Sequence, residues 1–405
     1  MAVITTKTEQ RTGLGDLALY GLSAGFAGLT ALTSTLTPHR AWGQVAFFGY
    51  CAAALITLLT IRSAGLRART WLTAVTFAMV ALVPLIAQAV QRADGRTDRA
   101  QEEVVVVEHA ATRLFRTGTP YLSRDAIETL PPDERLLGYT PYQPGMALFG
   151  APRALLGDAW WSDARIWFAV VTIAALVLAG RLLRGFPGPG LLRAGQAATV
   201  LPICALTLAT GGDDLPVLAL CLLAIALAAN ARFTASGLAI GAASALKLFA
   251  WPVALVLLAF ALREKRWSVA LGAFGLPALA LLPALAVDAD ALVENVVRFP
   301  SGHGLVTSPA QSPLPGYLIA SYLPGGRGIA LGLLLLGGVA MAWWLLRHPP
   351  ATAATVALIS AVGLTLAILL TPATRFGYLL YPIAFAALWL AVRSPGRALG
   401  RTQGA

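Results

Sequence analysis

Long apolar runs alternate with short polar loops along nearly the whole chain. A helix needs about 20 mostly apolar residues to cross a lipid bilayer. Backbone polar groups cannot stay unpaired in lipid, so such runs predict helices. We therefore expect an all-α fold, a polytopic transmembrane helical bundle of about 12 spans, at residues 15–36, 42–61, 70–91, 163–183, 194–210, 214–230, 235–248, 251–262, 267–287, 326–346, 351–371 and 376–392.

Two neighbouring runs, 235–248 and 251–262, are too short to span a bilayer comfortably. Arg232 and Arg263 flank the pair, and one continuous helix would place these two bases on opposite sides of the membrane. Proline cannot continue the hydrogen-bond ladder of a preceding helix, and Pro252 follows the first run closely. We expect a bent hairpin with Lys247 at its outer tip, shielded from lipid by neighbouring protein.

Two long segments lie outside the apolar runs and on the same predicted side. The first, 92–162, is predicted to be a large outer loop with interfacial helices. It includes a helix at 101–117, closed by Gly118, and a short apolar stretch at 144–157 that is typical of an interfacial or re-entrant helix. The second outer loop, 288–325, is rich in proline and glycine.

Charge divides the loops into two kinds. When the spans are taken in alternation, one side collects 16 of the 30 Lys and Arg residues but only three of the 19 acids: Glu9, Asp16 and Glu264. Basic excess in short loops marks the cytoplasmic side of a membrane protein. We therefore expect both ends, 1–14 and 393–405, to be cytoplasmic. Any carboxylate chemistry then lies on the extracytoplasmic face of the cell membrane.

Composition agrees with this picture and excludes others. Hydrophobic residues make up 57% of the chain and charged residues 12%, which is typical of a protein whose solvent is mostly lipid. The net charge of +11 comes from bases scattered over many loops, so we expect membrane lipid as a partner and no nucleic acid. We find no separate soluble domain and predict a single domain over 1–405.

The first candidate for chemistry is Glu103. Wound as a helix, the 101–117 segment places Glu103 on the same face as the apolar Val106 and Val107. A partly buried carboxylate there suits a general base that accepts a proton from a hydroxyl. The structural alternative is an acid favoured by the helix dipole at the N-terminus, which applies equally to Glu102.

A second acidic pair, Asp213 and Asp214, precedes a predicted span. Asp213 as an N-cap and Pro216 in the first turn explain the pattern structurally. Two adjacent acids exceed what capping needs, but they supply too few ligands for a metal ion by themselves. We expect no metal and no cofactor.

The candidate cations are Lys247 and Arg375. Lys247 lies within a long apolar stretch, where charge is costly and usually functional, and we favour a bound anion over a lysine that reaches to the lipid headgroups. Arg375 opens the last span with Tyr378, and arginine can hold a phosphate by two parallel hydrogen bonds; an interfacial arginine in an aromatic belt is the alternative. His303, between two glycines, is either incidental or orients a phosphate or hydroxyl.

Four segments, taken in order, resemble an integral membrane glycosyltransferase of the GT-C class, family 87, the type that depends on polyprenyl-phosphate mannose. The segments are Glu103 through Gly118-Thr-Pro-Tyr121, Tyr139-Thr-Pro-Tyr142 through Pro152, Ala245-Leu-Lys247 with Pro252, and Arg375-Phe-Gly-Tyr378 with Pro382. The resemblance covers most of the chain and implies a GT-C architecture. One departure is that the family usually carries Asp, followed by a Tyr, where this chain has Glu103 and a valine; Glu102 and Asp98 are alternatives for that role.

The resemblance implies transfer of a hexose, mannose in this family, from a polyprenyl-phosphate donor to an acceptor hydroxyl of a cell-envelope glycolipid or glycan on the outer face, with inversion. The implied catalytic residues are Glu103 and Glu102. The implied donor-phosphate ligands are Lys247, Arg375, Tyr378 and His303. The implied substrate contacts are Asp213, Asp214, Tyr121, Tyr142 and Arg113.

A secondary transporter or lipid flippase is the competing interpretation, because broken helices and many Pro and Gly residues also fit that class. Transporters usually carry polar groups near the bilayer midplane, whereas here charge concentrates at the predicted outer surface. An outer-face ligase or acyltransferase would share this topology and differ in its donor. The charge distribution favours chemistry at the outer surface.

Overall fold

The computed structural model describes residues 2–393, and the side chains of residues 13–393. Over this range the chain is helical and has no β-strand; Gln311 and Thr374 form one isolated bridge. The prediction of an all-α fold is confirmed. Apart from its first residue, the predicted tail 393–405 lies outside the described residues. The cytoplasmic location of both ends stays a prediction.

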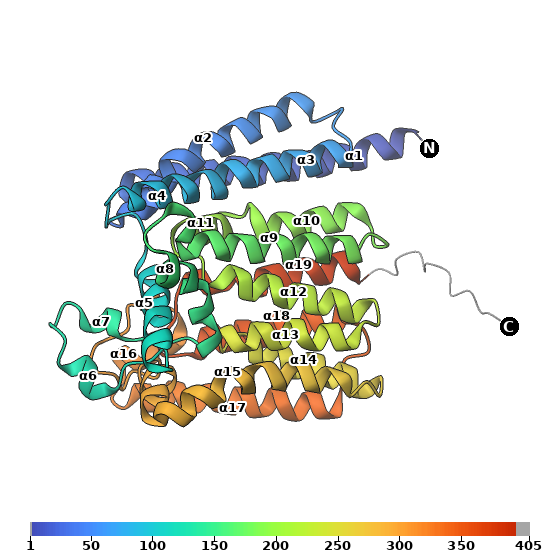
Figure 1. The fold of residues 1–405 in the computed structure, drawn as a ribbon. Coiled ribbons are helices and arrows are strands. Elements are labelled where there is room, and N and C mark those ends of the chain that lie inside the picture. Colours follow the sequence, from blue (N-terminus) through green and yellow to red (C-terminus); the bar gives the residue numbers. More distant parts are fainter. Residues whose placement is uncertain (1, 394–405) are drawn as a thin grey trace.

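The long helices run side by side, and the shorter outer helices gather at one end of them (Figure 1). The bundle helices are α1 (Ala2–Thr33), α2 (Thr37–Thr60), α3 (Leu66–Phe77), η1 (Ala78–Leu82), α4 (Val83–Ala93), α9 (Ala164–Leu182), α10 (Gly188–Thr199), α11 (Pro202–Thr210), α12 (Asp214–Ala229), α13 (Phe233–Leu246), α14 (Ala250–Arg263), α15 (Ser268–Val293), η4 (Glu294–Arg298), α17 (Gly326–Arg347), α18 (Ala353–Leu370), η5 (Phe376–Leu379) and α19 (Leu380–Val392).

The remaining elements form a layer at one end of the bundle, which we call the α5 end. They are α5 (Glu102–Thr117), α6 (Arg124–Glu128), α7 (Arg135–Gly138), η2 (Pro144–Gly150), α8 (Ala151–Leu156), η3 (Trp160–Ser162) and α16 (Pro315–Tyr322). The predicted helix at 101–117 is confirmed as α5, and Gly118 closes it in the left-handed conformation with φ +78°. The stretch predicted as an interfacial or re-entrant helix forms η2 and α8.

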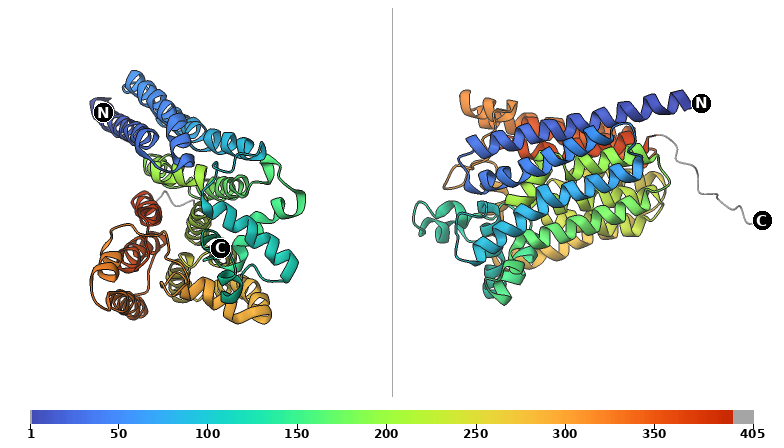
Figure 2. Two further views of the ribbon diagram at one scale, coloured as in Figure 1. Left: turned by 90° about the vertical axis from the view of Figure 1, so that its left-hand side faces the viewer. Right: turned by 90° about the horizontal axis from the view of Figure 1, so that it is seen from above.

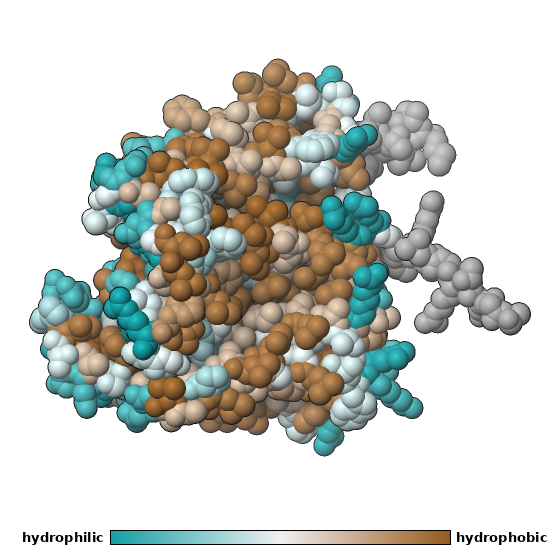
Figure 3. All heavy atoms as spheres, in the orientation of Figure 1, coloured by the Kyte–Doolittle hydropathy of each residue, from teal (hydrophilic) through white to brown (hydrophobic). Residues whose placement is uncertain are grey.

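All twelve predicted spans fall on helices. By length and composition, six helices among the described residues can cross a membrane, or seven if the bent pair α10 and α11 counts as one span. Four further apolar helices, α12, α13, α14 and 376–392, are shorter. The number of twelve spans is therefore not confirmed. Figure 3 shows a broad apolar belt with hydrophilic residues at its two ends. The chain is a multi-pass membrane protein.

The bend between α10 and α11 has a local structural cause. Helices α10 and α11 meet at an angle of 42°. Pro202 begins α11 and has no backbone N–H to continue the ladder of α10. At the bend the N–H of Cys204 donates to the carbonyl of Leu201, so the Val200 carbonyl is left without its i+4 helical partner. The hydroxyl of Tyr50, on α2, donates to the carbonyl oxygen of Val200 over 2.6 Å. This bond stabilises the bend inside an apolar environment.

The predicted hairpin is formed by α13 and α14. Lys247 adopts an extended conformation (φ −154°, ψ 145°) directly after α13, and α14 begins at Ala250. Helix α13 packs closely against α15, because a Cβ on Gly241 would lie 1.9 Å from the carbonyl oxygen of Gly272. Only glycine permits this approach. The neighbouring protein that the two short helices require is thus present.

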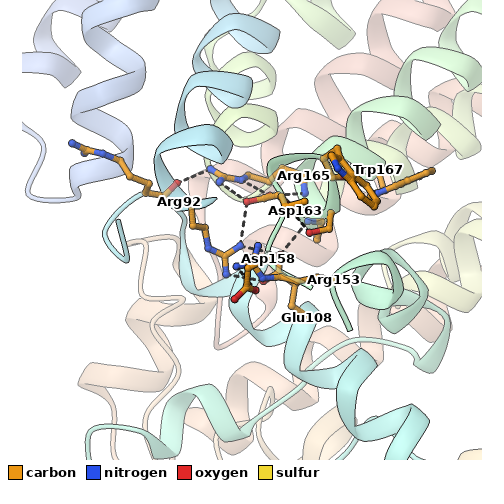
Figure 4. Close-up of polar contacts among 12 residues, drawn as sticks. Arg92, Glu108, Arg153, Asp158, Asp163, Arg165 and Trp167 are labelled. Carbon is orange, nitrogen blue, oxygen red and sulfur yellow. Dashed lines mark hydrogen bonds and ion pairs between the residues drawn. The ribbon is translucent and has the colours of Figure 1, made fainter. Parts of the chain in front are cut away.

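A buried ion network fixes α5 to the bundle (Figure 4). Arg92, at the end of α4, donates two hydrogen bonds to Glu108 of α5, at 2.9 and 2.6 Å. The same guanidinium contacts Asp163 at 3.1 Å, and Asp163 also accepts two bonds from the fully buried Arg165 of α9. Arg153 contacts Glu108 at 3.3 Å. Two helices of the bundle, α4 and α9, and two of the outer layer, α5 and α8, therefore share one set of charges.

We expect Asp163→Asn to lower the free energy of unfolding by about 3–5 kcal/mol, because it leaves the fully buried Arg165 guanidinium without its carboxylate. Asp158 offers a matched control: it pairs with Arg153 at 2.7 Å, but its side chain is 79% exposed. Asp158→Asn should change stability by less than about 1 kcal/mol. Denaturant or thermal unfolding in detergent measures both. Equal losses in the two variants would contradict a special role for the buried network.

Candidate active site

One cavity of about 1010 Å³ collects most of the residues that the sequence singled out. Viewed from the α5 end, the N-terminal and C-terminal helices occupy different sides of the bundle (Figure 2), yet residues from both line this cavity. Of the candidate residues, the lining includes Glu102, Glu103, Tyr142, Asp213, Asp214, Lys247, Arg375 and Tyr378. The glutamate helix, the lysine turn and the arginine turn therefore meet in one place.

Lys247 lies in a buried ion cluster. Its Nζ atom donates to Asp213 Oδ2 at 2.9 Å and to Asp214 Oδ1 at 2.7 Å. The hydroxyl of Tyr381, on α19, donates to the same oxygen of Asp214 over 2.7 Å. Gly212, with φ +83°, makes the turn that places the two aspartates at the start of α12. The ends of α12, α13 and α19 are joined by this cluster.

Aromatic rings surround the same ammonium group. Nζ of Lys247 lies 5.3 Å from the ring centre of Tyr142, 5.4 Å from that of Tyr378 and 6.0 Å from that of Phe249. Cations are attracted to the faces of such rings, most strongly where water is excluded. The sequence favoured a bound anion at Lys247. In this structure the anions that contact it are the protein's own two carboxylates.

Arg375 and Glu103 form the second ion pair of the cavity. Arg375 follows the extended segment that bridges to Gln311, and the backbone N–H of Phe376 donates to Ser312 Oγ over 2.9 Å. Burial lowers the pKa of Arg375, but the negative charge of Glu103 raises this pKa by more. The net shift is upward, and the guanidinium stays charged. Its side chain remains 33% exposed, against 15% for Glu103.

Glu102 lines the cavity beside this pair. Burial, and then the negative charge of Glu103, raise the pKa of Glu102 above its usual range. No ion pair to Glu102 is found in the described part of the chain. Glu102 and Glu103 both line the cavity, so both remain candidate bases. They differ in that Glu103 is paired with Arg375.

Three candidate residues, Arg113, Tyr121 and His303, lie outside the cavity lining, and their expected roles stay predictions. Arg113 donates to the Pro120 carbonyl at 3.0 Å and to Thr140 Oγ1 at 2.8 Å. The Tyr121 hydroxyl donates to the carbonyl of Tyr142 over 2.7 Å. These bonds hold the outer loop together and occupy the polar groups that were expected to contact substrate.

His303 is likewise outside the lining. It is exposed, and its Nδ1 lies 2.9 Å from Ser301 Oγ. Its backbone carbonyl accepts a bond from Arg124 at 3.2 Å. The position between two glycines serves a surface loop that is tied to α6, rather than the cavity that contains Arg375.

The lining also contains polar residues that the sequence analysis did not single out, and two of them are notable. His39, in the first turn of α2, and Gln101, which precedes α5, both line the cavity. Gln101 Oε1 accepts a bond from Thr210 Oγ1 at 2.7 Å, which ties the start of α5 to the end of α11. His39 is a polar residue at the predicted outer end of an apolar run, and that position was the only available signal.

The described residues contain no group of three or more His, Cys, Asp or Glu side chains placed to hold a metal ion. The residues that line the cavity can support chemistry of two kinds. Fixed cations can stabilise a phosphate leaving group, and a carboxylate can accept a proton from a hydroxyl.

The sequence pattern of glycosyltransferase family 87 matches residues 139–372, which is more than half of the chain. The chain belongs to glycosyltransferase family 87. The resemblance found in the sequence is thereby confirmed. The family 87 match includes the aspartate pair and Lys247, whereas Glu103 and Arg375 lie outside the matched residues.

Two solved structures are similar to this family 87 chain. A crystal structure of ArnT from Cupriavidus metallidurans bound to undecaprenyl phosphate has 16% sequence identity and a TM-score of 0.49. The same protein in the apo state has 18% identity and a TM-score of 0.41. Each alignment covers 79% of this chain and 59% of ArnT, so the chain spans about three fifths of the length of that protein. No curated protein matches the sequence.

We expect Lys247→Met to cost about 3–5 kcal/mol of unfolding free energy, because it leaves two adjacent carboxylates buried without a cation. Adding Asp213→Asn and Asp214→Asn removes those charges and should recover most of the loss. Unfolding in detergent measures the single and triple variants side by side. A triple variant no more stable than Lys247→Met would show that unpaired carboxylates are not the cause.

Proposed function

We propose that this family 87 protein transfers a hexose, mannose in the first instance, from a polyprenyl-phosphate donor to a hydroxyl of a cell-envelope glycolipid or glycan, with inversion. The observation that carries the proposal is the meeting of a guanidinium and two glutamates in one cavity that is otherwise mostly apolar. A lipid-linked sugar phosphate has three parts that such a cavity can bind: an apolar tail, an anion and a sugar.

The apolar part of the cavity supports a lipid donor. Side chains from the membrane helices line it: Leu19, Leu22 and Phe26 of α1, Leu201, Ile203 and Leu206 beside or on α11, and Leu379 and Ile383 at the start of α19. These helices belong to the bundle and lie within the apolar belt. A polyprenyl chain can be buried there, which contributes roughly 25 cal/mol per Å² of apolar surface.

In the proposed reaction Arg375 holds the donor phosphate. The acceptor hydroxyl gives its proton to Glu103 as its oxygen attacks the anomeric carbon of the sugar. The bond from that carbon to the phosphate oxygen breaks, and polyprenyl phosphate leaves with the electron pair. The guanidinium stabilises the charge that develops on the departing phosphate. Attack opposite the leaving group gives inversion.

The separation of the cavity carboxylates from the basic loops supports an extracytoplasmic location. The α5 end carries the carboxylates, and the basic loops Arg62 to Arg69 and Arg263 to Arg266 lie away from it in the order of spans predicted above. Nucleotide sugars are cytoplasmic metabolites, so a lipid carrier is the natural source of an activated sugar outside. This placement is part of the proposal.

The direct test supplies polyprenyl-phosphate mannose, labelled in the sugar, to membranes that contain the full chain. A labelled glycolipid or glycan is the expected product, and mass spectrometry of cell-envelope glycolipids in a deletion strain identifies the acceptor. Accumulation of a solute in proteoliposomes without any glycosyl product would favour a transporter or flippase instead.

We expect Glu103→Gln to lower kcat by about 100-fold or more, because the amide cannot accept the proton of the acceptor hydroxyl. Glu128→Gln, on the exposed face of α6, is the matched control for loss of an outer-layer carboxylate and should leave turnover unchanged. Labelled-sugar transfer by purified variants measures both. Normal turnover in Glu103→Gln, with a large loss in Glu102→Gln, would assign the base to Glu102.

A further inference from the structure

The charges that line the cavity pose a problem for an anionic donor. Two cations, Lys247 and Arg375, face four carboxylates, those of Glu102, Glu103, Asp213 and Asp214. When all are ionised, the lining carries an excess of negative charge. A phosphodiester that enters this low-dielectric space needs a cation that can exchange its carboxylate partner for the phosphate.

Lys247 is not that cation in this arrangement. Two of its three N–H donors are used by Asp213 and Asp214, and its side chain is only 8% exposed. Aromatic rings surround the ammonium group on further sides. Releasing Lys247 would separate it from two buried carboxylates at once, and the loss of either partner in such a cluster is costly.

Arg375 differs in each respect. A guanidinium has five N–H donors, and the recorded contact with Glu103 uses one nitrogen, Nη1. The side chain is four times as exposed as that of Lys247 and faces the cavity. Its partner is a single carboxylate on a different element, at the start of α5, so the pair can separate without disturbing the aspartate cluster.

We propose that the donor phosphate and the Glu103 carboxylate exchange on Arg375. In the empty cavity Glu103 is the counter-ion of the guanidinium. When the donor binds, a phosphate oxygen takes that place, and the carboxylate is released toward the sugar. This inference rests on the proposed function and adds an order of events: the base becomes free only once the donor is bound.

The exchange has a chemical consequence. While the ion pair is closed, Glu103 Oε1 is bonded to the guanidinium and is not available to the proton of an acceptor hydroxyl. In the proposal, exchange on Arg375 frees this oxygen when the donor binds. The same guanidinium that stabilises the leaving phosphate thus controls when the base is available. Glu102, which has no ion pair among the residues described, lacks this control.

The test measures binding, so that it is independent of turnover. Undecaprenyl phosphate is titrated into the purified full chain in detergent, with tryptophan fluorescence as the signal. Glu103→Gln should bind it about 3-fold or more tightly than the wild type, because the competing carboxylate is gone. Glu102→Gln removes the same charge from the same cavity without touching Arg375, and its effect should be clearly smaller.

Two controls separate the exchange from a general electrostatic effect. Undecaprenol, which has the same tail and no phosphate, should bind equally well to the wild type and to Glu103→Gln. In an Arg375→Gln background phosphate binding should weaken, and adding Glu103→Gln should no longer tighten it, as a double-mutant cycle requires. Glu103→Ala, which also lacks the carboxylate, replaces Glu103→Gln if that variant does not fold.

The outcomes distinguish the two proposals. Equal or weaker phosphate binding in Glu103→Gln, or equal tightening in Glu102→Gln, overturns the exchange while the proposed function stands. A wild-type chain that binds no undecaprenyl phosphate and transfers no sugar overturns the proposed function itself. Tightening that persists in the Arg375→Gln background also overturns the exchange, because the competition would then occur elsewhere.

Discussion

The buried cluster of Lys247, Asp213 and Asp214 is the interaction on which the arrangement of the cavity depends. Charges in an apolar bundle are tolerated only when they are paired and hydrogen-bonded. The cluster therefore fixes the start of α12, the break between α13 and α14, and, through Tyr381, the last helix. Short helices that end inside protein are possible because these partners occupy their ends.

A second set of charges holds α5 from the opposite side. Glu108, in the middle of α5, is bound by Arg92, and the backbone N–H of Ala164 donates to it at 3.1 Å. One turn and a half earlier in the same helix, Glu103 reaches Arg375. The Glu108 carboxylate is thus held by several donors, whereas Glu103 pairs with one guanidinium. That difference places the adjustable contact where the chemistry is proposed.

The sequence predicts the helices well because lipid imposes one requirement on every span. An apolar run in a bilayer has no alternative to the helix, so hydropathy finds each run, and Pro252 with Lys247 marks the break in the hairpin. The pairing of charges is different in kind. Lys247 meets an aspartate 34 residues away, and Arg375 meets a glutamate 272 residues away. No local pattern encodes either contact, because each follows from how the bundle packs.

The same reasoning explains why some candidate residues lie outside the cavity lining. The outer loop is rich in polar groups, and pattern alone does not separate those that close the loop, such as Arg113 and Tyr121, from those that face a substrate. His39 and Gln101 reach the cavity because α2 and the start of α5 pack beside α11. Their contribution depends on tertiary contacts and leaves almost no trace in the sequence.

The bend between α10 and α11 has a consequence for how a lipid would be received. Tyr50 satisfies the carbonyl that the bend leaves over, so this elbow is an equilibrium shape of the bundle and needs no ligand to form it. The residues at the elbow, Leu201 and Pro202, are part of the cavity wall. In the proposed function, a carrier lipid would therefore meet a bend that is already formed. Recognition of its isoprene units would then depend on how they fit the shape of this bend.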